Sequence, residues 1–317
     1  MVRLNALTAA AVLSFASAVY GAPTPDEVNL PQPEDFKTQL GYDPDYDVAV
    51  RGTRRVASNK KISEIIPEII TVNVADIPQS NATEFPASII GPAEPESAKR
   101  AILGNDDRVL WTNRDYPYRA MGRISLSNGV FCSGALIGSR HVATARHCIP
   151  GEGVSARFQP AYDNGEVLGG YDVSVVFHAT YGQTGWCANG YDWAIFVLAE
   201  KAGTANGWLG LKTVNPDTQL NKPLFFHYGY PGDKGGSRPY RQESITATAA
   251  TGCDRGSPVV TDTDSAGGQS GGPVWIYEDG SRYLYAIHVG STDTFSVAAG
   301  GPSLFDGFGI LLKDYPY

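Results

Sequence analysis

Gly267-Gly268-Gln269-Ser270-Gly271-Gly272-Pro273-Val274-Trp275-Ile276-Tyr277 is a glycine-rich turn that runs directly into a short apolar segment. Glycines permit tight backbone conformations that side chains exclude, so Ser270 is expected to be presented by its neighbours. The apolar residues that follow have the length and aromatic content of a strand. The stretch therefore predicts a serine held in a turn at the start of a β-strand. The alternative is a glycine-rich hairpin with an incidental serine.

Short apolar or alternating segments of this kind recur through the C-terminal two thirds of the chain. They are rich in Val, Ile, Phe and Tyr and are separated by clusters of Gly, Asn, Asp and Pro. This pattern is typical of strands and favours an all-β fold of one or two closed antiparallel barrels over a helical fold. The segments are 134–137, 173–177, 193–198, 224–227, 273–277 and 283–289.

Composition narrows the class of protein. The chain has 317 residues, 42% of them hydrophobic, which is enough for a substantial core or two smaller ones. The net charge of -8 argues against nucleic acid as a partner, because phosphate-binding proteins concentrate Lys and Arg. There is no repeat of fixed period.

The N-terminus has the pattern of a signal peptide. Arg3 precedes an apolar run over 6–19, and Ala16-Ser17-Ala18 supplies the small residues of a cleavage site. We expect residues 1–18, or as far as residue 22, to be removed on secretion. A transmembrane anchor is the alternative, but it needs about 20 apolar residues and this run is shorter. No membrane association is therefore expected.

The next segment, residues 19–100, is interpreted as a propeptide. From residue 23 it is rich in Pro, Glu, Asp and Lys, lacks Cys and Trp, and contains the glycosylation sequon of Asn81. It ends at the dibasic pair Lys99-Arg100, which is like the sites cut by kexin-type processing enzymes. Cleavage there would leave residues 101–317 as the mature domain, beginning at Ala101. Alternatively, the basic pair is only a solvated surface feature.

Four cysteines have a clear meaning in a secreted chain, where disulfides form readily. Three pairings are possible, and we favour Cys132–Cys148 with Cys187–Cys253, because the first two flank a segment that contains His147. Zinc is the alternative, but the chain has neither a CxxC pair nor HExxH. We expect no metal site and no cofactor.

A serine hydroxyl becomes a nucleophile only when a base takes its proton and donors stabilise the developing oxyanion. His147 is the preferred base among five histidines, since it follows a strand-like stretch and adjoins Cys148, which a disulfide could hold. The backbone N–H groups of Gly268 and Ser270 would form the oxyanion hole. No mechanism is assigned to the remaining histidines, for which structural roles are expected. They are His141, His178 and His227, with His288 considered below.

A carboxylate is needed to orient the imidazole, and Asp192 is the candidate. It opens the apolar run 192–198, where a buried carboxylate is costly unless it is paired. The alternative is that Asp192 merely ends the turn 189–191.

Taken together, these motifs resemble the secreted serine proteases of the chymotrypsin fold, over most of residues 101–317. The resemblance implies two six-stranded antiparallel barrels with the active site in the cleft between them. It further implies that Ser270, His147 and Asp192 form a catalytic triad. The segments that carry the resemblance are 132–137, 144–148, 192–195 and 268–273.

One departure points to a branch of that family. Gln269 stands where animal digestive proteases carry an aspartate that pairs with the new N-terminal amine, and Gln269 cannot form that ion pair. The pattern is instead similar to the bacterial glutamyl endopeptidases, which segments 101–108 and 229–234 also resemble. The branch implies that an acidic substrate side chain is bound by Ser265, His288 and Ser291, with added charge from the α-amine of Ala101. Alternatively, His288 is only a buried strand histidine.

The sequence thus predicts a secreted serine endopeptidase that cleaves after Glu, or Asp. Its partners would be protein or peptide substrates and its own propeptide, and a monomer is the default. Two rivals remain: a protease of the same fold with another preference, and a catalytically silent binding protein that keeps the barrels.

Overall fold

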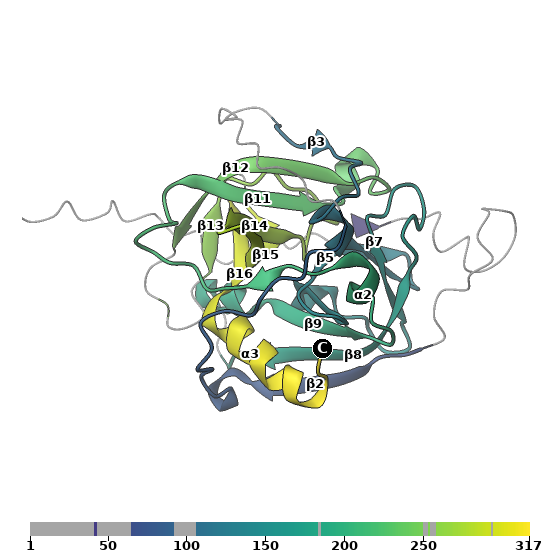
Figure 1. The fold of residues 1–317 in the computed structure, drawn as a ribbon, viewed down its shortest axis with the longest axis horizontal. Helices are drawn as coiled ribbons and strands as arrows, with labels where there is room; N and C mark the ends of the chain where they lie inside the picture. Colours follow the sequence, from purple (N-terminus) through teal and green to yellow (C-terminus); the bar gives the residue numbers. More distant parts are fainter. Residues whose placement is uncertain are drawn as a thin grey trace, which may run out of the picture. The chain divides into compact units, whose positions relative to one another are not determined.

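The computed structural model of the protein describes residues 41–42, 65–91, 106–182, 185–249, 253, 258–292 and 294–317. The expected signal peptide, the dibasic pair Lys99-Arg100 and Ala101 lie outside these residues. The described chain is mostly strand and forms two closed antiparallel barrels of six strands each (Figure 1). The predicted all-β class with two barrels is confirmed.

The first barrel has the strand order β5-β4-β7-β8-β9-β6 and closes by pairing of β5 with β6. All six neighbouring pairs are antiparallel. Its strands are β4 (Met121–Leu126), β5 (Val130–Leu136), β6 (His141–Ala145), β7 (Ala156–Pro160), β8 (Tyr171–Thr180) and β9 (Trp193–Leu198).

The second barrel has the order β15-β14-β11-β12-β13-β16 and closes between β15 and β16. Its strands are β11 (Pro223–Gly229), β12 (Tyr240–Ala249), β13 (Val259–Thr261), β14 (Pro273–Glu278), β15 (Ser281–Ser291) and β16 (Ser296–Gly300). The six apolar segments of the sequence overlap β5, β8, β9, β11, β14 and β15, so the alternating pattern located these strands correctly.

The described fold also has four further strands and two α-helices. β1 (Gly41–Tyr42) and β3 (Val109–Leu110) extend the barrels antiparallel, on β5 and β12. β2 (Glu68–Asn73) and β10 (Gly210–Leu211) run parallel to β8 and β15. The helices are α2 (Gly203–Asn206) and α3 (Gly301–Asp314). No helix in the described ranges is long and apolar enough to cross a membrane.

Strand β9 is buried on both faces, which explains why its sequence is continuously apolar rather than alternating. One face fills the first barrel, and the other is covered by α3. There the indole Nε1 of Trp193 donates a hydrogen bond of 2.9 Å to the hydroxyl of Ser303. Because Asp192 directly precedes this strand, its carboxylate is carried to the edge of a fully packed core.

Candidate active site

The structure brings His147 and Asp192 into direct contact. His147 lies in a single 3₁₀ turn, Arg146–Cys148, immediately after β6, and Asp192 immediately precedes β9. β6 and β9 are antiparallel neighbours whose last paired residues are Ala145 and Trp193. The chain that leaves β6 therefore runs beside the chain that enters β9, and the backbone N–H of Arg146 donates to the carbonyl of Asp192 at 3.1 Å. The Nδ1 of His147 is 2.7 Å from Asp192 Oδ2, and its backbone N–H donates to Oδ1 at 3.0 Å.

This carboxylate sets the orientation and the tautomer of the His147 ring. A hydrogen bond to a carboxylate holds the imidazole proton on Nδ1, which leaves the lone pair on Nε2. Nε2 is buried and has no hydrogen-bond partner among the residues that the structure describes. The ring therefore presents Nε2 as a fixed proton acceptor. The same hydrogen bonds compensate for the cost of burying the Asp192 carboxylate.

Both disulfides of the favoured pairing are present. Cys132 in β5 is bonded to Cys148, which ties the turn that carries His147 to the neighbouring strand. Cys187 is bonded to Cys253, which joins the segment just before Asp192 to a residue of the second half of the chain. Each disulfide thus restrains the backbone next to one residue of the His147–Asp192 pair.

The turn around Ser270 is attached to the first barrel through Ser133 of β5. The backbone N–H of Ser133 donates to the carbonyl of Ser270 at 2.8 Å, and its hydroxyl donates to the carbonyl of Gly268 at 2.8 Å. The sulfur of Cys148 lies 3.8 Å from the same Ser270 carbonyl. Ser270 is therefore held beside the turn that carries His147, and it is 2% exposed.

Two glycines in this turn are required by its geometry. Gly268 and Gly271 have φ values of +98° and +86°, which L side chains rarely adopt. A Cβ on Gly268 would collide with the Phe131 ring, and one on Gly271 with the Ser133 carbonyl. The glycine-rich sequence therefore reflects a close approach of two barrels, which a simple hairpin would not need.

His288 lies on β15 next to the Ser270 turn. Its backbone N–H donates to the carbonyl of Gly272 at 2.9 Å, and its carbonyl accepts from Gly271 at 2.7 Å. Burial holds the pKa of His288 well below its usual value, with further contributions from the nearby rings of His227 and His147. The imidazole of His288 is therefore neutral at physiological pH.

Sequence analysis missed the neighbour of His288. The ring centroids of His227 and His288 are 5.4 Å apart, and burial lowers the pKa of His227 to about 4. Its Nδ1 lies 3.2 Å from the carbonyl of Pro273. The sequence shows only that His227 lies within an apolar run. It does not show that His288 of β15 lies beside it.

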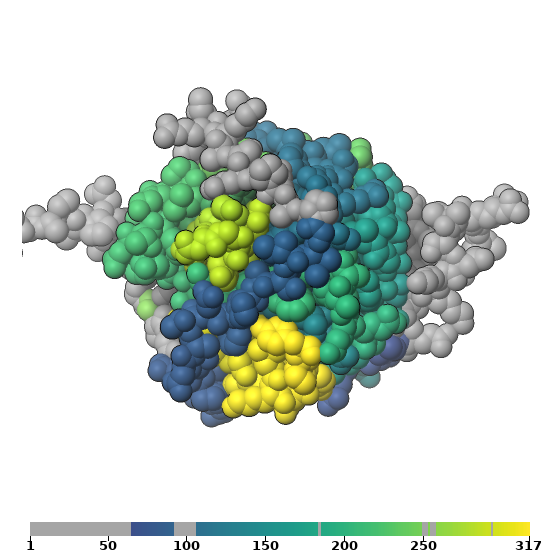
Figure 2. All heavy atoms as spheres, in the orientation of Figure 1, coloured from purple at the N-terminus to yellow at the C-terminus, as the bar shows by residue number. Residues whose placement is uncertain are grey.

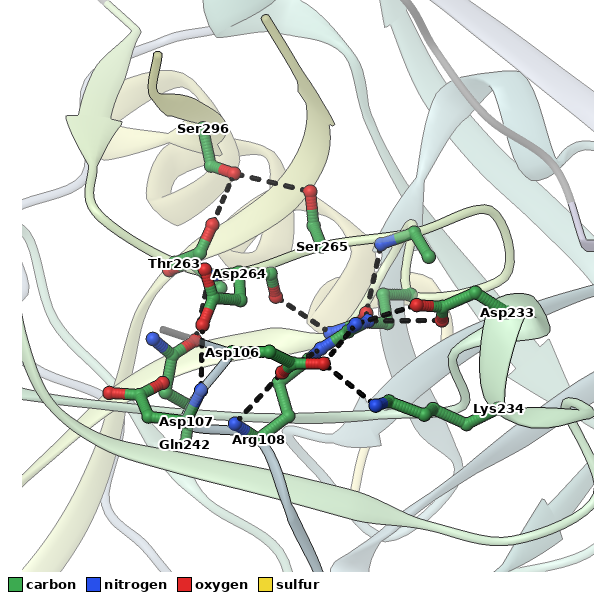
Figure 3. A network of polar contacts seen from close by, with 12 residues as sticks. Asp106, Asp107, Arg108, Asp233, Lys234, Gln242, Thr263, Asp264, Ser265 and Ser296 are labelled. Atoms are coloured by element: carbon green, nitrogen blue, oxygen red, sulfur yellow. Dashed lines mark hydrogen bonds and ion pairs between the residues drawn. The ribbon is translucent and has the colours of Figure 1, made fainter. Parts of the chain in front are cut away.

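The two serines predicted to accompany His288, Ser265 and Ser291, are both neighbours of a third serine, Ser296. Ser265 and Ser296 have hydroxyl oxygens 3.2 Å apart, and Ser296 also donates to the carbonyl of Thr263 at 2.6 Å (Figure 3). Ser291 is the ladder partner of Ser296 between β15 and β16. Ser296 thus connects Ser265 to β15, the strand that carries Ser291 and His288, and Ser296 was not found from the sequence.

Gln269 is held by a buried arginine. Arg108, whose side chain is 6% exposed and whose surroundings are drawn in Figure 3, donates from Nη1 to Gln269 Oε1 at 2.8 Å, a contact that the figure does not label. The same guanidinium bonds Asp106 at 2.9 Å and Asp233 at 2.6 Å. Burial opposes the charge on Arg108, but these carboxylates raise its pKa above the usual value, and its hydrogen bond holds the pKa of Asp106 well below the usual range.

This contact is the counterpart of the ion pair that Gln269 cannot make. Gln269 also accepts from the backbone N–H of Ala266 at 2.9 Å and donates to the carbonyl of Asp264 at 3.2 Å. Among the residues that the structure describes, the cation that bonds the residue before Ser270 is the side chain of Arg108.

Arg108→Gln is expected to lower kcat by about tenfold to a hundredfold with little change in KM, because a hydrogen bond to a charged group contributes about 1.5–3 kcal/mol. Steady-state kinetics on a peptide substrate measure this split. Lys234→Gln is the matched control: Lys234 bonds Asp106 at 2.7 Å, and no contact with Gln269 is described for it. An equal effect in both variants, or a change confined to KM, would contradict a positioning role for Arg108.

A further acidic pair adjoins Ser265. The backbone N–H of Asp107 donates to Asp264 Oδ2 at 3.0 Å (Figure 3). Burial raises the pKa of Asp107 to about 7, and the hydrogen bond and negative charge of Asp264 act in the same direction. The surroundings of Asp107 thus favour its protonated form, which lowers the negative charge of the Asp107–Asp264 pair.

The chain has two barrels, of which one carries a His–Asp pair and the other a glycine-flanked serine. This arrangement is that of the chymotrypsin-type fold. A profile of the trypsin family matches residues 112–301, and the chain belongs to this family. It is 31% identical over 212 residues to the glutamyl endopeptidase of Bacillus licheniformis, a match that covers 62% of this chain and 61% of that protein. The chain thus spans about three fifths of the length of this relative.

Among solved structures, a Glu endopeptidase in complex with MPD is similar, with a TM-score of 0.54 and 20% identity. The superposition covers 67% of this chain and 99% of the other. This likeness establishes the fold.

Proposed function

We propose that the protein is a secreted serine endopeptidase with Ser270 as nucleophile, His147 as general base and Asp192 as the residue that orients the base. The observation that carries this proposal is the 2.7 Å hydrogen bond from His147 to Asp192, which leaves Nε2 buried and without a described partner. Hydrogen bonds to Ser133 of β5 hold the Ser270 turn, and the sulfur of Cys148, next to His147, lies 3.8 Å from the Ser270 carbonyl.

In the proposed reaction, the Ser270 hydroxyl attacks the peptide carbonyl while His147 Nε2 takes its proton. The negative charge that develops on the carbonyl oxygen is met by the backbone N–H groups of Gly268 and Ser270. His147 then gives the proton to the leaving amine, and an acyl-enzyme remains on Ser270. Water, deprotonated by the same imidazole, hydrolyses the ester and restores the free hydroxyl.

We further propose a preference for Glu, or Asp, before the scissile bond. Support comes from the name of the Bacillus licheniformis relative and from Ser296, which bonds Ser265 and pairs with Ser291 on the strand that carries His288. A neutral imidazole donates one hydrogen bond to a carboxylate, and the hydroxyls of Ser265 and Ser291 supply others. After processing, the α-amine of Ala101 would add a positive charge.

The proposal includes export and processing. A signal peptide of residues 1–18, or as far as 22, would be removed, and cleavage after Arg100 would separate the propeptide 19–100 from the protease 101–317. The sequon residue Asn81 is exposed, which is compatible with glycosylation.

A panel of peptides that differ only in the residue before the cleaved bond tests this proposal. Glu is expected to exceed Gln by a factor of about 100 or more in kcat/KM, because Gln has the same shape but lacks the charge. Comparable cleavage after Lys would instead favour a protease of another preference. Failure of an organophosphonate to label Ser270 would favour a catalytically silent binding protein.

A further inference from the structure

A segment of the expected propeptide is an integral part of the described fold. The N-terminal arm, residues 65–91, runs over both barrels, and Figure 2 shows it in blue along the yellow helix α3. Ile77 of the arm is 4% exposed and belongs to the main hydrophobic core. A propeptide segment that inhibits the enzyme would need to occupy the site around Ser270. The contacts of the arm therefore show whether it is placed to inhibit or to support the fold.

The first contact is a strand added to the first barrel. β2 pairs in parallel with β8 over Val175–Thr180, in register from Glu68 to Asn73. β7 pairs with β8 only at Tyr171 and Asp172, so β2 occupies the edge that β7 leaves. Without β2, six consecutive residues of β8 would present an unpaired edge, which proteins normally cover.

The second contact joins the arm to the C-terminal helix and to the segment near β10. The ring of Phe85 lies 4.6 Å from that of Phe305 and 4.9 Å from that of Phe308, both in α3. The backbone of Phe85 exchanges hydrogen bonds of 3.0 and 2.9 Å with Leu211, and Glu84 bonds Lys212 at 3.0 Å.

These contacts avoid the candidate active site. The described hydrogen bonds and ion pairs of the arm go to β8, α3, residues 208–212 and Tyr283. None of those described joins it to His147, Asp192 or Ser270. The arm has no cysteine, so only noncovalent contacts would hold it once the chain is cut.

We propose that the arm remains bound after cleavage behind Arg100 and forms a noncovalent second chain of the mature protein. It completes the β8 edge and covers the aromatic face of α3 without obstructing the Ser270 site. The inference rests on the proposed processing but is independent of the substrate preference, because retention does not require turnover.

The test is to cut the folded full-length protein and ask whether the arm leaves. Residues 95–100 are replaced by the recognition sequence of a site-specific protease, so that the cut is certain. We expect a fragment containing 65–91 to co-elute one to one with the C-terminal chain and to separate only in denaturant. Amides of Val175–Thr180 should exchange as slowly as in the uncut protein. A separate fragment, or rapid exchange of these amides, would overturn the proposal.

Variants of the arm test whether its contacts with α3 are what retain the fragment. Phe85→Ala is expected to release the fragment about tenfold to a hundredfold faster after the cut, because it removes the contacts with Phe305 and Phe308. Ile69→Ala is the matched control, since Ile69 belongs to the same arm, in β2, but is 48% exposed. Equal release rates would refute the interface. If Phe85→Ala fails to fold, amide exchange in the unsubstituted protein decides. Retention without peptidase activity would refute the proposed function and leave this inference intact.

Discussion

Ser270→Ala is expected to lower kcat/KM by about 10⁴- to 10⁶-fold, the range found when nucleophiles of other triad enzymes are removed. The substitution deletes the only atom that would bond to the substrate carbonyl carbon. It should leave the fold intact, because the backbone contacts of the turn to Ser133 and Cys148 do not involve the hydroxyl. Hydrolysis of a Glu peptide by the purified processed variant, with a thermal unfolding curve, measures both effects.

Ser174→Ala is the matched control for this prediction. Its hydroxyl bonds the carbonyl of Val197 within the first barrel, at 3.1 Å, and it carries no proposed catalytic role. We expect this control to retain activity within about twofold, since substitutions away from special features usually change little. A Ser270→Ala protein that cleaves at the rate of the control would show that another group is the nucleophile.

Asp192→Asn is expected to lower kcat by about 10⁴-fold with only a small change in KM, as the corresponding change does in another triad protease. The side chain would keep its shape, but its amide could donate to Nδ1 of His147. The imidazole proton would then move to Nε2, and the ring could no longer accept the proton of Ser270. Burst and steady-state kinetics on the same peptide report the loss.

Two comparisons sharpen the Asp192 prediction. Asp172→Asn removes another partly buried carboxylate, one that bonds Arg157, and should leave kcat nearly unchanged. The double variant Ser270→Ala, Asp192→Asn should be no slower than Ser270→Ala alone, because the two groups act as one unit. Additive losses would mean that Asp192 acts independently of the nucleophile, contrary to the proposed mechanism.

Strand positions were predictable because each depends on a pattern within a few residues. The run 193–198 became β9 with the same bounds, and the glycines around Ser270 marked a turn that side chains would block. The predicted pairing of Cys132 with Cys148 was likewise local, across 16 residues. The helix α3 was not predicted: it has no side-chain N-cap and contains Gly307 and Gly309, although Pro302 near its start is a helix-start signal.

The contact of His147 with Asp192 was inferred from residue chemistry, but its geometry depends on the register of β6 against β9. That register is set by packing of the whole barrel, which no short segment encodes.

Hydrophobic periodicity and turn chemistry are properties of neighbouring residues, so the sequence alone located the strands and the candidate serine, histidine and aspartate. The arrangement in two barrels was implied by the resemblance of its motifs to a known family. Three other contacts join residues that are 61 to 161 positions apart in the sequence. They are the bond from Arg108 to Gln269, the contact of His227 with His288, and the pairing of β2 with β8. Such contacts form only after chain closure, when packing selects one arrangement among many that the same residues would permit. They became visible only in the folded molecule.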